Sequence, residues 1–447
     1  MQEYITLYDY LLLPFYLLLF FFIVRKKAKK YEGTGLKKIF FAAFWLRMAG
    51  AIFYGLLIQY YYGYGDSFGF YLGGNMLSHM IQHDISSLKY LFASGNEIIV
   101  EAKAMGLADE APASMPIDSN AFVMKVSAII SFFTFNKYLI ISVCFGFFSF
   151  IGIWKLFYIF YELNSKKHKR LLAIFVIYFP SCWFWGSGLL KESLCIGALG
   201  ILLGALYKMF ISKQEYIKNV ILIICMLYIL LMVKSYIIAI LAVSAFIGIS
   251  AFLIGKIKTK FIKIGFITGF LISAYFIIVN LDTSIIDNFV NDSFRQIKTF
   301  QSSYQAVQME DESSKATFSL SDINPTLQGI LLNAPMVIGT CLFRPFPWEA
   351  KKIIMFFSSL EALVTLFATV YLLMSMFVIK FFKYVFEDPV NLFCFIFCLL
   401  FALLIGYTTF NFGTMVRYKI IFLPFYFFML IHIYTAKQDH AAAKATI

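Results

Sequence analysis

The sequence predicts an all-α, polytopic integral membrane protein, and three observations support that fold class. Hydrophobic residues make up 61% of the 447 residues, and the mean hydropathy is +0.79. A soluble domain of this length could not bury that much apolar surface. Several apolar runs exceed the roughly 20 residues that cross a bilayer as a helix. These runs also lack the alternation of apolar and polar residues that marks the strands of membrane barrels.

The hydrophobic runs predict about 11 spanning helices within a single transmembrane domain that covers residues 1–447. The short apolar stretch 121–136 is not counted as a span, although it could dip into the outer leaflet. The expected spans are residues 5–24, 39–62, 138–161, 171–187, 192–211, 219–233, 236–254, 264–281, 353–379, 391–409 and 420–435.

Basic clusters orient these spans, because lysine and arginine favour the cytoplasmic side of a membrane. RKKAKK follows the first span, SKKHKR follows the third, and KIKTKFIK follows the seventh. These loops are expected inside, with the N-terminus outside and the C-terminus inside. MQEYITLYDY carries no positive charge before the first apolar run, so that run is expected to be a retained helix and not a cleaved signal.

The same topology places two long segments, 63–137 with interfacial helices and 282–352, at the outer face. The net charge of +13 comes mostly from clusters beside apolar runs, where cations meet anionic lipid headgroups. Membrane lipids are therefore expected partners, and nucleic acid is not. Each of the four motifs described below falls at the outer face, which predicts one shared site at the membrane boundary.

The first motif, GYGDSFGFY, places Asp66 directly after the second span. Gly63 and Gly65 allow a tight turn, and the aromatic residues suit the headgroup layer. A carboxylate held there can accept a proton from a hydroxyl group or bind a divalent cation. The alternative is that Asp66 caps the helix that begins near Ser67.

The second motif, PSCWFWGSGLLKES, places Lys191 and Glu192 at the start of the fifth span. Pro180 is expected to kink the fourth span, and glycines form the turn after it. Lys191 can bind a phosphate as a point charge, and Glu192 can orient it. The alternative is a surface Lys–Glu pair whose charged groups reach water.

The third motif, FRPFPWEA, holds Arg344 between Phe343 and Pro345. A rigid arginine at the interface can bind phosphate through two parallel hydrogen bonds. Trp348 can anchor at headgroup depth or stack on a sugar ring, and Glu349 lies beside it. The alternative is an interfacial anchor with no chemical role.

The fourth motif, MVRYKIIFLP, places Arg417 at the outer end of the last span, against the usual bias of basic residues toward the inside. Pro424 is expected to break that helix about one turn further on.

His79 and His83 have the i, i+4 spacing of metal ligands but lack the companion glutamate of HExxH. A solvent-exposed helix face is therefore the preferred interpretation of this pair. The metal requirement is left unknown.

These motifs resemble those of the polytopic glycosyltransferases of the C superfamily, which use lipid-phosphate sugars as donors. GDSFGFY is similar to the acidic motif of their first outer loop. PSCWFWGSGLLKES is similar to the proline-then-aromatic helix ends of bacterial members, and RYKIIFLPFYFFMLI to their closing helix. Two features depart from the family. A single acid, Asp66, stands where several branches carry an Asp–Glu pair, and an extra crossing precedes it.

The resemblance implies an inverting glycosyltransferase in the cytoplasmic membrane, with a lipid-linked sugar donor and a glycan, lipid or protein acceptor. Asp66 would deprotonate the acceptor hydroxyl. Lys191, Arg344 and Arg417 would bind the donor phosphate. Glu192 or Glu349 would orient these cations or hold a divalent cation, and no other cofactor is implied.

Two alternatives remain. An O-antigen-type polysaccharide polymerase would use Arg295, Arg344 and Arg417 to hold a pyrophosphate and would not depend on Asp66. A lipid or polysaccharide transporter would place polar residues through the whole membrane, and the tenth span carries almost no charge.

Overall fold

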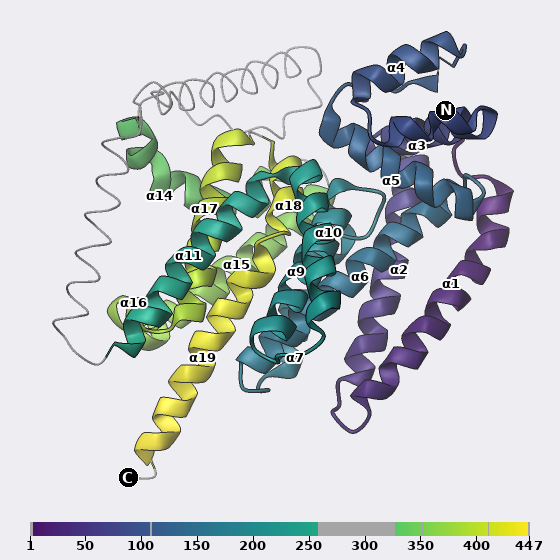
Figure 1. The fold of residues 1–447 in the computed structure, drawn as a ribbon. Helices are drawn as coiled ribbons and strands as arrows, with labels where there is room; N and C mark the ends of the chain where they lie inside the picture. Colours follow the sequence, from purple (N-terminus) through teal and green to yellow (C-terminus); the bar gives the residue numbers. More distant parts are fainter. Residues whose placement is uncertain (1–2, 108–109, 258–326, 351–352, 410, 446–447) are drawn as a thin grey trace. The chain divides into compact units, whose positions relative to one another are not determined.

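The computed structural model describes residues 3–107, 110–257, 327–350, 353–409 and 411–445. Throughout these ranges the regular secondary structure is helical, with no strand (Figure 1). The chain divides into two compact units, Met1–Ala239 and Ile240–Ile447. The expected span 264–281 and most of the expected outer segment 282–352 lie outside the described residues.

Eight helices in the described ranges are long and apolar enough to cross a membrane. Counting a bent pair near the C-terminus as one span gives up to nine. The prediction of a multi-pass, all-helical membrane protein is confirmed, while the total of 11 and the sidedness stay predictions. The eight helices are α1 (Leu7–Ala28), α2 (Lys37–Leu57), α6 (Tyr138–Leu163), α9 (Lys191–Phe210), α10 (Tyr216–Lys234), α11 (Tyr236–Lys256), α15 (Ile353–Met376) and α17 (Pro389–Thr408).

The core of the first unit is a seam between α6 and α9 that small residues make possible. Gly152 lies against Gly197 and Gly200, and a Cβ on any of these glycines would collide with the opposite helix. Further along both helices, Gly204 lies against the Lys155 side chain. Residue numbers therefore rise in the same direction on both sides of the seam, so α6 and α9 are parallel. Close approach through glycine is a common way for membrane helices to associate.

Because α6 and α9 are parallel, the chain between them must return along their length. It does so in pieces, as α7 (Lys169–Leu172), a π-helical turn (Ala173–Ile177) and α8 (Pro180–Phe184). The span expected over 171–187, with a kink at Pro180, is interrupted more strongly than a kink. Pro180 disfavours helical backbone in the residue before it, and Phe179 is extended, with φ −61° and ψ 122°. The helix therefore ends and restarts at Pro180.

The start of α1 is tied to the start of α6 by a buried acid. The carboxylate of Asp9 accepts a hydrogen bond from the Thr6 amide (2.9 Å), which caps α1. Its second oxygen accepts a bond from the Leu139 amide in the first turn of α6 (2.9 Å). Asp9 is fully buried, so each oxygen has replaced water with a backbone donor. This contact fixes two spans at one end of the unit.

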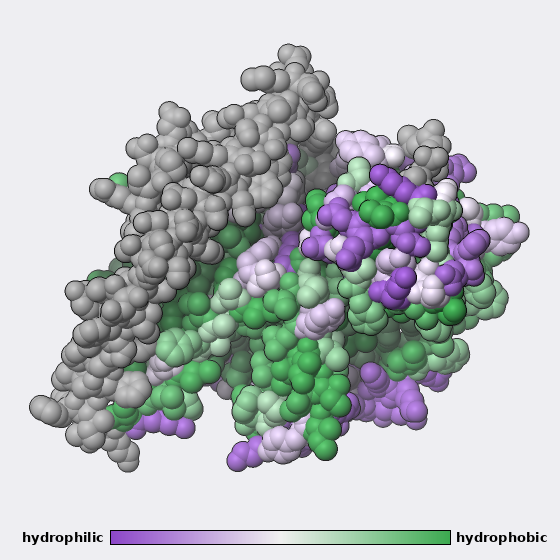
Figure 2. Space-filling model, turned by 45° about the horizontal axis from the view of Figure 1, so that its top comes forward, coloured by the Kyte–Doolittle hydropathy of each residue, from purple (hydrophilic) through white to green (hydrophobic). Residues whose placement is uncertain are grey.

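Residues 66–134 form three further α-helices, α3 (Asp66–His83), α4 (Gly95–Ala104) and α5 (Asp118–Thr134), with a 3-10 helix (Ile85–Leu91) between the first two. The apolar stretch expected at 121–136 is α5. It packs along α3, where Gly73 lies against Met124 and Gly74 against Ser127. Hydrophilic residues gather over α4 and its surroundings, and the helices below present mostly hydrophobic surface (Figure 2).

The second unit packs around α17, which contacts α14 (Leu327–Phe343), α16 (Val378–Glu387) and α19 (Leu423–Ala445). Phe397 of α17 lies between the rings of Phe401 (4.9 Å) and Phe425 (4.6 Å). A short helix, α18 (Phe412–Lys419), precedes α19, and the two meet at 58°. The break expected near Pro424 is confirmed. The last helix extends beyond the predicted end at 435 as far as Ala445.

Candidate functional site

Asp66 occupies the first turn of α3 and is exposed. Gly65 precedes the helix with φ +156°, and Gly63 ends the preceding π-helical turn with φ +72°. Both conformations favour glycine, as the sequence predicted. The residue that caps α3 is Gly65, not Asp66. The carboxylate lies where the helix dipole stabilises negative charge, because the first amide groups of a helix point toward it.

Lys191 opens α9 and is half-buried. Its ammonium group donates a hydrogen bond to the Ser119 hydroxyl of α5 (2.8 Å). This bond ties the second motif to the segment that follows the first.

Glu192 does not form the surface pair with Lys191 that was considered as an alternative. It is fully buried and accepts a hydrogen bond from Lys234, the last residue of α10, at 2.8 Å. The Lys234 side chain is 7% exposed. Two opposite charges removed from water in this way neutralise each other, so the pair clamps α9 to α10.

Asp66, Lys191 and Lys234 belong to the same end of the first unit. Ser67, next to Asp66, shares a hydrogen bond of 2.8 Å with Tyr138, the first residue of α6. Lys191 is the first residue of α9, which runs parallel to α6. The first two motifs therefore lie at the end where α6 and α9 begin.

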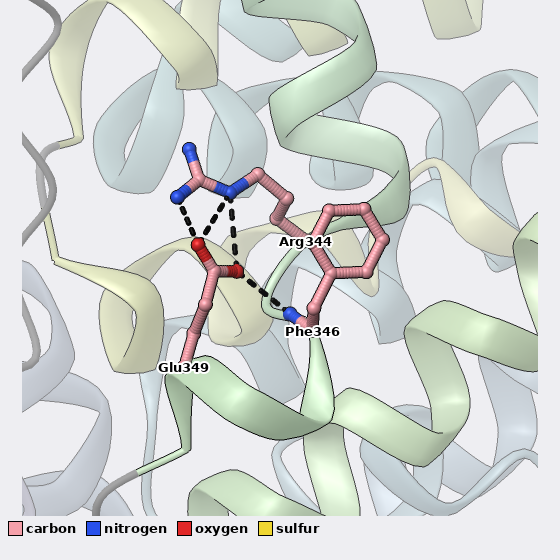
Figure 3. A network of polar contacts seen from close by, with 3 residues as sticks. All are labelled: Arg344, Phe346 and Glu349. Atoms are coloured by element: carbon pink, nitrogen blue, oxygen red, sulfur yellow. Dashed lines mark hydrogen bonds and ion pairs between the residues drawn. The ribbon is translucent and has the colours of Figure 1, made fainter.

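In the second unit, Arg344 and Glu349 form a multiply bonded ion pair (Figure 3). Arg344 Nε donates to both Glu349 oxygens, at 3.0 and 3.1 Å, and Nη2 donates to Oε1. Glu349 Oε2 also accepts a bond from the Phe346 amide (2.7 Å). The two side chains are 28% and 18% exposed. The carboxylate thus fixes the plane of the guanidinium while part of it stays open to solvent.

The same contacts set the pKa of Glu349. Partial burial would raise the pKa, but the hydrogen bonds from Arg344 and the Phe346 amide lower it, and the net result lies below the ordinary value of 4.5. Glu349 is therefore ionised at neutral pH and able to hold Arg344.

Helix α18 supplies two further contacts to Arg344. The guanidinium lies over the Phe412 ring, 5.1 Å from its centroid. The Lys419 ammonium donates to the Arg344 carbonyl at 3.0 Å, and Lys419 is 4% exposed. Arg417 lies between these two residues on the same helix and is half-buried. The third and fourth motifs therefore come together in the second unit.

Trp348 is 78% exposed and stacks on Phe346, with ring centroids 4.8 Å apart. An exposed flat aromatic surface beside a fixed arginine can take either expected role, as a headgroup anchor or as a platform for a sugar ring. Asp66 and Lys191 belong to one unit and Arg344 and Arg417 to the other. The meeting of all four motifs in a single site stays a prediction.

Metal ligands do not cluster in the described ranges: no group of three His, Cys, Asp or Glu residues is placed to hold an ion. His79 Nδ1 lies 3.3 Å from a Glu110 oxygen, which makes a two-residue contact. Arg295, which the polymerase alternative would use, lies outside the described residues.

Sequence reasoning missed three participants, namely Lys234, Ser119 and Phe412. Lys234 carried a weak signal, because a lysine between two apolar runs requires a partner or access to water. Ser119 and Phe412 are ordinary residues whose roles depend on how helices pack. Comparison of the chain with protein-family models, with curated proteins and with solved structures finds no match.

Proposed function

We propose that this chain is a membrane glycosyltransferase. It moves a sugar from a polyprenyl-phosphate donor to an acceptor hydroxyl at the outer face of the cytoplasmic membrane. The observation that carries the proposal is the orientation of Arg344. A guanidinium that is fixed by both oxygens of Glu349, and is still partly exposed, is suited to grip a phosphate beside the apolar surface on which a lipid chain lies.

In the proposed reaction, Asp66 accepts the proton of the acceptor hydroxyl as that oxygen attacks the anomeric carbon of the sugar. The bond between this carbon and the phosphate oxygen breaks, and polyprenyl phosphate leaves with its negative charge. Attack opposite the phosphate inverts the anomeric centre. Lys191, Arg344 and Arg417 stabilise the charge that develops on the leaving group. Glu349 acts as a positioning residue for Arg344.

In this proposal, the buried pair of Glu192 and Lys234 holds α9 against α10 and takes no part in the reaction. Glu192 is fully buried and paired with Lys234, so we propose that it does not contact the donor. Trp348 is assigned to the sugar or to the headgroup layer because of its exposure.

The test uses the full chain in lipid nanodiscs with a panel of polyprenyl-phosphate hexoses and a membrane glycan extract as acceptor. Mass spectrometry measures the polyprenyl phosphate that is released. Asp66→Asn should lower turnover about 10²–10⁴-fold, which is the usual contribution of a general base. Glu97→Gln is the matched control. It removes a first-turn carboxylate from α4, and glutamine can keep the capping box there. Equal turnover by the two variants would end the transferase proposal.

A second candidate, the polysaccharide polymerase, is favoured by the contacts between Arg344 and α18, which need no residue of the first unit. With polyprenyl-diphosphate oligosaccharides as substrates, this candidate expects Arg344→Ala to shorten the glycan products and Asp66→Asn to leave their length unchanged.

A further inference from the structure

A cavity of about 580 Å³ lies within the first unit at the end opposite Asp66 and Lys191. It is bounded by the C-terminal parts of α1, α6 and α9 and by the start of α2. None of the predicted site residues lines it. Its charged lining is one-sided, with a single carboxylate from Glu162 against the lysines Lys26, Lys27, Lys30, Lys155 and Lys208.

Lys155 lies deeper in its helix than the basic residues that usually flank a membrane span. It precedes the end of α6 at Leu163 by about two turns and is half-buried within an apolar span. Gly204 faces it on α9, where a Cβ would lie 3.0 Å from the Lys155 side chain. A lysine at this depth is costly unless an anion or water offsets its charge.

The carboxylates near the cavity neutralise only part of this charge, because among the described residues Lys208 alone of the five lysines is in an ion pair. Glu162 pairs with Lys166 at 3.5 Å, and Lys208 pairs with Glu215 at 3.2 Å. In the part of the chain that the structure describes, no carboxylate forms an ion pair with Lys26, Lys27 or Lys155. Their mutual repulsion favours binding of an external anion.

The remaining walls are largely apolar and aromatic, together with Ser212 and Gln214. Tyr31 accepts a hydrogen bond from Trp154 Nε1 (2.8 Å), and its ring packs on Phe40 at 5.1 Å. Toward the middle of the helices, the lining consists of Ile23, Phe147, Phe150 and Ile151. A ligand that fills this cavity therefore has a negative group for the lysines and a hydrocarbon part for the inner wall.

We propose that this cavity binds the phosphate headgroup of an anionic amphiphile, with its hydrocarbon chain against the apolar wall. It is a second site, distinct from the proposed donor site, and does not depend on the transferase function. Lysine ammonium groups hold phosphate as point charges, and Lys155 marks the depth that the phosphate reaches.

The experiment measures phosphatidic acid binding to the full chain by native mass spectrometry, after extraction from phosphatidylcholine nanodiscs. Lys155→Met keeps the length of the side chain and removes its charge. It should weaken phosphatidic acid binding about tenfold. Lys38→Met is the matched control. Lys38 is exposed, lies near the start of α2 and does not line the cavity. The control should bind phosphatidic acid as the unaltered chain does.

Equal affinity of the two variants for phosphatidic acid would overturn the proposal. A second arm uses inorganic pyrophosphate to separate a lipid from a soluble ligand. If pyrophosphate displaced phosphatidic acid at comparable concentrations, the hydrocarbon tail of the lipid would contribute nothing to its affinity. That result would overturn the assignment of the ligand as an amphiphile. Lys26 and Lys27 lie at the exposed end of α1. The double variant Lys26→Gln with Lys27→Gln should therefore weaken phosphatidic acid binding without disturbing the helix packing.

Discussion

Two carboxylate–cation pairs, Glu192–Lys234 and Arg344–Glu349, differ in what surrounds them. The Glu192 and Lys234 side chains are 0% and 7% exposed, and a Glu192 oxygen accepts a hydrogen bond from Lys234 at 2.8 Å in the interior of the first unit. Arg344 and Glu349 are 28% and 18% exposed and share several bonds, beside the exposed ring of Trp348. A pair sealed in this way can act only through the helices it joins. A pair that is held firmly but left partly open can also meet a ligand.

The largest effect is expected from breaking the sealed pair. Glu192→Gln leaves Lys234 buried without its counter-charge and should lower the free energy of unfolding by about 3–5 kcal/mol. Thermal unfolding in detergent measures the loss. The double variant Glu192→Leu with Lys234→Met removes both charges and should recover most of the stability. A double variant as unstable as the single one would contradict the assignment of this pair to a charge clamp.

Arg344→Lys should have a smaller effect on stability and a clear effect on binding. Lysine keeps the charge but cannot reach both oxygens of Glu349 in one plane. We expect a loss of about 1 kcal/mol in unfolding free energy and about tenfold weaker binding of polyprenyl phosphate, measured by native mass spectrometry. Lys383→Gln removes one charge from an exposed pair on α16 (3.7 Å) and serves as the control. Unchanged binding by Arg344→Lys would remove the reason for placing phosphate at this arginine.

The smallest effect is a pH dependence of the open pair. The pKa of folded Glu349 lies below its ordinary value of 4.5. Its stabilising contribution is therefore complete above pH 4.5 and is lost as the pH falls through the lowered pKa. Because the pair is partly exposed, the contribution is under about 1 kcal/mol. The difference in melting temperature between the unaltered chain and Glu349→Gln should shrink across this acidic window. A constant difference would show that the carboxylate charge does not stabilise the fold.

Hydropathy was sufficient to locate most of the helices, because a span is defined by its own residues. The exception at 171–187 shows the limit of this reasoning. An average over an apolar window does not register that Pro180 forces Phe179 into an extended conformation. The sequence predicted a kink at that proline. Its position was correct, but the structure shows a complete break, because the helix ends before Pro180 and restarts there.

The pairing of Arg344 with Glu349 was within reach of the sequence, because only four residues, two of them prolines, lie between them and make a short, stiff path. The partner of Glu192 was not, because Lys234 comes 42 positions later on another helix. The basic cavity was hidden for the same reason. Its lysines were visible as charges at helix ends, but their convergence on Lys155 depends on the packing of α1 against α6 and on the small size of Gly204.

The glycine seam between α6 and α9 has a consequence for how the chain is made. Two parallel helices must enter the bilayer in the same orientation, so α6 has to wait there while the interrupted segment and then α9 emerge from the ribosome. Until then, Gly152 lacks the α9 neighbours that it has in the folded structure. A bulky residue at Gly152 would therefore leave α6 inserted but deny α9 its docking place, and the defect would arise during biogenesis.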